Sequence, residues 1–146
     1  MYHYIECGLP NIYLKNGFTV ELIDDEEYIS INDMNCLHST IAQIIVDSHT
    51  ALRPAEFKFL RVELNLSQKM LGNRFGVSEQ TIARYEKGQS DIPRTTDAAL
   101  RSLYMEKLEK NNPVGFFLDL LSDSEAKQAT QEILLEETGS HWAITV

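Results

Sequence analysis

Cysteine is scarce in this sequence, and long hydrophobic runs are missing. Its two cysteines, Cys7 and Cys36, are too few for a disulfide framework and fit a reducing cytosol. No stretch reaches the roughly 18 apolar residues that a membrane-spanning helix needs. The first six residues have neither the basic nor the apolar region of a signal peptide. We therefore expect a cytoplasmic protein with no membrane partner.

Motifs that carry catalysis are also missing. The chain has no glycine-rich phosphate loop, no Gly-x-Ser-x-Gly elbow and no His-Glu-x-x-His pair. The carboxylates fall in runs typical of solvated surface, and Cys7 has no evident base partner along the chain. We expect no enzyme activity, no catalytic residues and no cofactor.

A metal site is a conceivable alternative near the N-terminus. His3, Cys7, Cys36 and His38 could form a Cys2His2 set. Zinc sites normally space their paired ligands more regularly than these residues are spaced. A buried free cysteine and surface histidines explain the same residues more simply, so we expect no metal.

The net charge of −9 is unevenly distributed. Nine of the 13 basic residues, but six of the 22 acidic ones, lie from Arg53 to Arg101, so this stretch carries +3 and the rest carries −12. Because local potential matters more than the whole-chain sum, the central stretch can still face a polyanion. The acidic flanks either dock a basic protein or form a solvated surface that aids solubility.

Three segments separate by pattern. Residues 1–50 combine β texture with a connecting helix, and Asn16-Gly17 predicts a tight hairpin between strands 12–14 and 18–23. The acidic residues 24–27 then form a turn before a third strand at 28–31. Asp33 is expected to cap a helix to about His49, whose apolar stripe is Leu37, Ile41, Ile44 and Ile45.

The remaining two segments are predicted to be largely helical. Residues 51–108 form helices with short joints, and residues 109–146 contain helices at 114–121 and 124–137. A strand at 141–146 is expected to return to the N-terminal hairpin, because two strands alone are marginally stable. The fold class is therefore mainly α, with a small N-terminal β-hairpin segment and a helical C-terminal tail.

Residues 67–88 have the pattern of two short helices joined by a turn. Ser67 is a good N-cap for a helix at 68–75, and Gly76 stands where the chain must leave that helix. Ser78 then caps a second helix at 79–87. Small Gly72 would let Ile82 approach closely, so that the helices cross near a right angle. The second helix then projects outward, where it can enter the roughly 12 Å major groove of DNA.

These residues resemble the lambda-repressor-like (Xre-type) helix-turn-helix family over about Phe57 to Tyr104. One departure is Gly72, where the family usually has alanine, at a cost of about 1 kcal/mol in helix propensity. The resemblance is carried by Leu66-Ser67-Gln68, Gly76-Val77-Ser78, Thr81-Ile82-Ala83-Arg84-Tyr85-Glu86-Lys87-Gly88 and Ile92-Pro93.

The resemblance implies a set of DNA-binding residues. Gln68 matches the family glutamine that contacts phosphate and supports the reading residue, and Glu79, Gln80 and Arg84 match positions that face base edges. Their chemistry agrees, since glutamine pairs with adenine, arginine with guanine, and glutamate accepts from cytosine. Thr81 can touch a thymine methyl group or a phosphate. The set is completed by candidates for backbone contact or capping at the interface: Lys69, Arg74, Ser78 and Lys87.

Several of these residues have a second interpretation. Arg84 could be solvated or paired with Glu79 or Glu86, and the carboxylate of Glu79 would repel phosphate. Tyr85 is expected to pack over the helix pair rather than stack on a base, and Glu86 to cap or pair within the domain. The expected core is Leu71, Phe75, Val77, Ile82, Leu100 and Leu103.

The predicted function is sequence-specific DNA binding by a transcriptional regulator. We expect a homodimeric repressor with a five-helix domain at 51–108, its dimer contact in the N-terminal segment or the 114–137 helices. The apolar residues Phe116, Phe117, Leu120 and Leu121 serve that contact or cap the core. Two alternatives stay open. In the first, the chain is an antitoxin: the arrangement resembles antitoxins of the MqsA and HigA kinds, which neutralise a toxin, although the zinc-binding Cys-x-x-Cys motifs of the MqsA kind are missing. In the second, the domain is an adaptor that has lost DNA binding.

Overall fold

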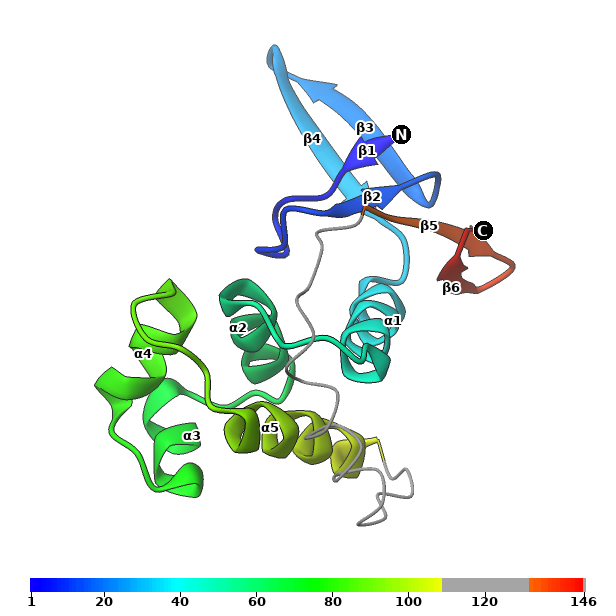
Figure 1. Ribbon diagram of the computed structural model, residues 1–146. Coiled ribbons are helices and arrows are strands. Elements are labelled where there is room, and N and C mark those ends of the chain that lie inside the picture. Colours follow the sequence, from blue (N-terminus) through cyan, green and yellow to red (C-terminus); the bar gives the residue numbers. More distant parts are fainter. Residues whose placement is uncertain (109–131, 146) are drawn as a thin grey trace. The chain divides into compact units, whose positions relative to one another are not determined.

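Two compact units make up the chain (Figure 1). The computed structural model describes residues 1–108 and 132–145. The first unit is Met1–Ile41 together with Thr130–Val146, and the second is Ala42–Ala129. The boundary between them falls inside one helix, α1 (Met34–Asp47). Over the described ranges, no helix is both long enough and apolar enough to cross a membrane.

A four-stranded sheet forms the core of the first unit. Its strands follow the order β1 (Tyr2–His3), β2 (Ile12–Leu14), β5 (Ile133–Thr138) and β6 (His141–Ile144). β2 and β5 run parallel, and the other neighbours are antiparallel. Side chains from both ends of the chain are buried in this unit: Tyr4, Leu9, Ile12, Leu14, Leu135 and Trp142.

The predicted hairpin around Asn16-Gly17 is wrong, because the hairpin lies one strand later. β3 (Phe18–Ile23) pairs with β4 (Glu26–Ile31), and the tight turn is Asp24-Asp25, with φ of 52° and 65°. A two-residue turn of this kind needs two consecutive positive φ values, which aspartate tolerates. At 16–17 only Gly17 has one, and Lys15 N–H donates instead to the Leu135 carbonyl at 2.7 Å. β2 therefore pairs with β5 rather than with β3.

The predicted helix at 124–137 is also wrong where the structure describes it, since Ile133–Thr138 is strand β5. A short apolar run is compatible with a helix or a strand. Here the strand forms because its pairing with β2 buries Leu135 completely. The terminal strand is confirmed as β6, but it pairs with β5 rather than directly with the N-terminal strands. The predicted helix at 114–121, with its four apolar residues, lies outside the described residues.

Helix α1 begins as predicted after Asp33. The carboxylate of Asp33 accepts from the Cys36 amide at 3.3 Å, and the helix ends at Asp47. Of the expected stripe, Leu37, Ile41 and Ile45 are buried and Ile44 is half-buried. The predicted capping residue and the predicted core face are therefore confirmed.

Residues 51–108 contain four helices, where five were expected. They are α2 (Pro54–Glu63), α3 (Gln68–Phe75), α4 (Glu79–Lys87) and α5 (Arg94–Lys107). The fifth helix is α1, which precedes this range. The inward faces of α2 to α5 form one apolar core, made of Phe57, Phe59, Leu60, Leu71, Ile82, Tyr85, Ala98, Leu100 and Tyr104.

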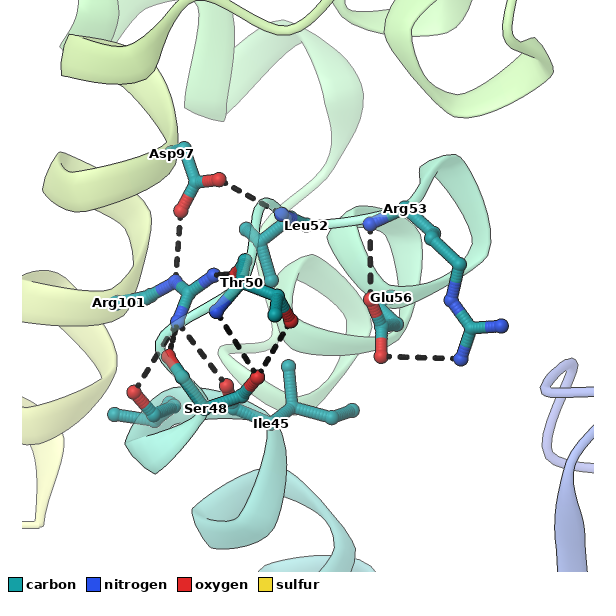
Figure 2. Close-up of polar contacts among 9 residues, drawn as sticks. Ile45, Ser48, Thr50, Leu52, Arg53, Glu56, Asp97 and Arg101 are labelled. Carbon is teal, nitrogen blue, oxygen red and sulfur yellow. Dashed lines mark hydrogen bonds and ion pairs between the residues drawn. The ribbon is translucent and has the colours of Figure 1, made fainter. Parts of the chain in front are cut away.

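A buried arginine on α5 fixes the segment between α1 and α2 (Figure 2). Arg101 is 1% exposed, and its Nε donates to Asp97 Oδ1 at 2.7 Å. Its two terminal nitrogens donate to the carbonyls of Ile45, Val46, Ser48 and Thr50. The second oxygen of Asp97 accepts from the Leu52 amide at 2.8 Å. The arginine thus pairs its charge and also satisfies carbonyls at the end of α1.

Candidate nucleic-acid interface

Serine caps and left-handed glycines define both helices of the motif. Ser67 accepts from the Met70 amide at 3.0 Å, and Ser78 accepts from the Thr81 amide at 3.1 Å. α3 and α4 end at Gly76 and Gly88, with φ of 71° and 73°. These conformations favour glycine, so each helix stops within nine residues. The bounds agree with those predicted from the sequence.

Gly72 is needed for a different reason from the one expected. A Cβ at this position would lie 2.7 Å from the Val77 carbonyl oxygen and 3.3 Å from the Ser78 carbonyl carbon. The close contact is therefore with the backbone of the turn, not with Ile82. Backbone cannot move aside as a flexible side chain can, so larger residues at position 72 would disturb the turn that aims α4.

One face of α4 carries the predicted base-contacting residues. Glu79, Gln80 and Arg84 are exposed, as is the predicted phosphate contact Lys87, while Ile82 and Tyr85 on the other side are buried. Their spacing places them on adjoining positions of one helical face. Ala83 lies within the same face, and its short side chain leaves the longer ones prominent. A face of this kind can enter a groove and present hydrogen-bonding groups to base edges.

The predicted backbone-contacting residues flank this face. Lys69 and Arg74 are exposed on α3, at opposite ends of the helix, and Lys87 is exposed in the last turn of α4. Ser78 and Thr81 lie at the N-terminus of α4 with their hydroxyl oxygens 2.9 Å apart. Exposed Glu79 is the acidic residue among them, so the outward surface of α3 and α4 is basic on balance, which suits a phosphate backbone.

Gln68 is held in place by charged residues behind it. Its Nε2 donates to Glu86 Oε1 at 3.1 Å, and Glu86 pairs with Arg61 through contacts of 2.5 and 3.0 Å. Arg61 also donates to the Leu66 carbonyl at 2.9 Å. The Gln68 amide has two N–H donors, and this network uses one. Gln68 is thus oriented at the start of α3 with a donor left for a phosphate.

The network decides between several of the alternatives. Glu86 pairs within the domain as expected, and its carboxylate serves Arg61 and Gln68 rather than Arg84. Tyr85 packs in the core, 6% exposed, with its ring edge against Phe57 at 5.7 Å. Leu71, Ile82 and Leu100 are fully buried, whereas three of the expected core residues are half-buried: Phe75, Val77 and Leu103.

The ion pair between Arg61 and Glu86 was not predicted from the sequence, although Glu86 itself was expected to cap or pair within the domain. Arg61 and Glu86 lie 25 residues apart, and no local pattern pairs them. A signal was present in Arg61, a charged residue on the apolar face of α2, since a buried charge needs a partner. Asp97 and Arg101 carry a plainer signal, because they are four apart on one helix.

Three of the four histidine and cysteine side chains considered for metal make other contacts. Cys7 Sγ donates to the Tyr4 carbonyl at 3.3 Å, and the Tyr4 hydroxyl lies 2.7 Å from His38 Nε2. His3 Nε2 contacts the Pro10 carbonyl at 2.7 Å. Burial raises the pKa of the Cys7 thiol, which disfavours the thiolate that a metal or a nucleophile needs. In residues 1–108 and 132–145, no three acidic, cysteine or histidine side chains form a metal-binding group.

Comparison with known proteins identifies the same part of the chain. Residues 57–99 match a family model described as helix-turn-helix. This range begins inside α2, contains α3 and α4, and ends inside α5. No curated protein and no solved structure gives a significant match.

Proposed function

We propose that this chain represses transcription as a homodimer on a near-palindromic operator. Its residues 57–99 are a helix-turn-helix domain of the Xre, lambda-repressor-like type, which supports a DNA-binding regulator. The observation that carries the proposal is the exposed face of α4, with Gln80, Arg84 and Lys87 directed away from the core. Gln68, oriented by Glu86, supplies a backbone contact beside it.

The dimer is inferred from the geometry of DNA. One α4 covers only a few base pairs, so a single copy reads too little sequence for a unique site. Two copies would present recognition helices about 34 Å apart, in successive major grooves of one face. A bound dimer over a promoter would exclude polymerase, which favours repression. The proposed role needs a cytoplasmic location and no catalytic activity.

An Arg84→Ala variant tests the proposal. We expect it to lose about 1–3 kcal/mol of binding to the protein's own promoter, concentrated at particular base pairs, because arginine reads guanine through two hydrogen bonds. The measurement is a quantitative mobility-shift titration against promoter fragments that carry single base-pair changes.

Lys87→Ala, one turn further along the same helix, is the matched control. Lys87 is a predicted phosphate contact, so its loss should weaken binding to all fragments equally. It should also reduce by about one the slope of log affinity against log salt concentration. Equal binding by wild type and Arg84→Ala would contradict the reading role. No DNA binding by either protein would favour the adaptor alternative.

A second candidate function is that of an antitoxin which binds a basic toxin and represses its own operon. It is supported by the charge of the first unit, which has one basic and ten acidic residues, whereas the second unit has 12 of each. The whole net charge of the chain thus belongs to the unit without the helix-turn-helix. Deletion of the gene should then be lethal unless the adjacent basic gene product is deleted too, and viability of the single deletion would contradict this candidate.

A further inference from the structure

The two faces of the β3–β4 hairpin differ in how many apolar side chains they carry. Phe18 stands opposite Ile31, Val20 opposite Ile29, and Leu22 opposite Glu27. Since side chains alternate along a strand, these pairs share one face of the hairpin. The other face carries Thr19, Glu21, Ile23, Glu26, Tyr28 and Ser30. We call the first the ribbon face, made of Phe18, Val20, Leu22, Ile29 and Ile31.

The outer half of the ribbon face is in solvent. Val20 is 50% and Leu22 is 69% exposed, whereas Phe18, at the inner end, contacts the Tyr2 ring at 5.4 Å between centroids. β3 and β4 form a sheet of their own with two strands. A two-stranded sheet is marginally stable when nothing covers its apolar face. Contiguous exposed apolar side chains of this kind are typical of interaction surfaces.

The charges around this face select the partner. Five carboxylates line the outer half of the hairpin, and no lysine or arginine occurs from Asn16 to Leu52. These five are Glu21, Asp24, Asp25, Glu26 and Glu27. The first unit has one such base, Lys15, which pairs with Glu136 at 3.2 Å. A second copy that docked through its own first unit would therefore bring carboxylates without cations to meet them, and nucleic acid or an anionic membrane would be repelled.

We propose that the ribbon face and its five carboxylates form the docking surface for a basic protein. The partner surface that fits has an apolar centre for Val20 and Leu22 and a rim of lysine or arginine for the carboxylates. This interaction is independent of DNA binding, because it uses residues of the first unit alone.

Zero-length carbodiimide cross-linking tests the proposal directly, since it joins carboxylates to amines in contact. The hairpin offers five carboxylates and no lysine, so every cross-link from it must end on an amine elsewhere. We would treat cells of the source organism that express the tagged full-length chain and map the cross-linked peptides by mass spectrometry. The expected result is a cross-link from residues 21–27 to lysines of a protein with net positive charge.

The identified protein is then purified and titrated against full-length variants. Val20→Thr and Leu22→Thr keep strand propensity and should each weaken Kd about tenfold. The matched control is Val62→Thr on α2, where the valine is 53% exposed, and it should leave Kd unchanged. Asp24→Asn with Asp25→Asn keeps the turn conformation and should slow association about tenfold at low salt.

Each other outcome overturns the proposal. Cross-links from residues 21–27 only to further copies of the chain would assign the ribbon face to self-association. Their absence, or cross-links to an acidic protein, would refute a basic partner. Equal Kd for Val20→Thr, Leu22→Thr and Val62→Thr would show that the apolar side chains take no part. Promoter binding by the same variants should equal that of wild type, which separates this proposal from the regulator function.

Discussion

Arg101→Met is expected to lower the free energy of unfolding of the helix-turn-helix unit by about 3–5 kcal/mol. The substitution leaves Asp97 buried without its cation, and it removes the donors from the Ser48 and Thr50 carbonyls (Figure 2). Methionine fills much of the volume but satisfies none of these groups, which carry a desolvation cost once unpaired. Urea unfolding followed by helical circular dichroism measures the loss.

The double variant Asp97→Asn with Arg101→Met separates charge from shape. It removes the buried anion together with the cation, so it should recover part of the stability that Arg101→Met loses. The asparagine side chain introduced there can still accept from the Leu52 amide, as Asp97 does at 2.8 Å. If Arg101→Met unfolds at the same urea concentration as wild type, the buried pair does not hold this segment.

Glu86→Ala is expected to lower the free energy of unfolding by about 3 kcal/mol, which is the second large effect. Glu86 and Arg61 side chains are 3% and 11% exposed, so the change leaves a guanidinium with little access to water and one carbonyl partner. Gln68 loses its acceptor at the same time. Promoter binding should weaken beyond the stability effect, because Gln68 is then free to leave the orientation that faces a phosphate.

Glu79→Ala is the matched control, since it removes the other glutamate of the same helix. Glu79 is exposed at the N-terminus of α4, where a carboxylate contributes less than about 1 kcal/mol through the helix dipole. The free energies of unfolding of the two variants should therefore differ clearly. Similar stabilities for Glu86→Ala and Glu79→Ala would show that the Arg61–Glu86 pair is not a structural element.

The helix-turn-helix could be predicted almost residue by residue because its signals are local. Ser67 and Ser78 cap the helices from one turn away, and Gly76 and Gly88 end them by their own backbone conformation. Such determinants act within a few residues, so the sequence contains them in readable form. The exposed positions of α4 follow from helical periodicity alone.

The strand pairing could not be predicted in the same way. Asn16-Gly17 is a strong hairpin signal, yet Lys15 bonds to Leu135 from the far end of the chain, and Gly17 lies so close to the Trp142 ring that a Cβ would overlap it. The same long-range pairing turns Ile133–Thr138 from an expected helix into a strand. Local propensity is a weak prior where tertiary pairing buries an apolar run.

The site was incomplete from the sequence for a related reason. The surface residues of α3 and α4 follow from the motif, but the support behind Gln68 depends on Arg61 from another helix. Contacts between residues distant in sequence are visible only after the helices have packed. The described structure thus adds the positioning network to a reading face that the motif already indicated.

Sequence-specific recognition of DNA by α4 is the central claim, and one specificity ratio tests it most directly. The full-length chain is titrated against its own promoter fragment and against a scrambled fragment of equal composition, both at about 150 mM salt. We predict that the promoter binds at least about 10³-fold more tightly. Equal affinity for the two fragments, or no binding to either, would contradict the account.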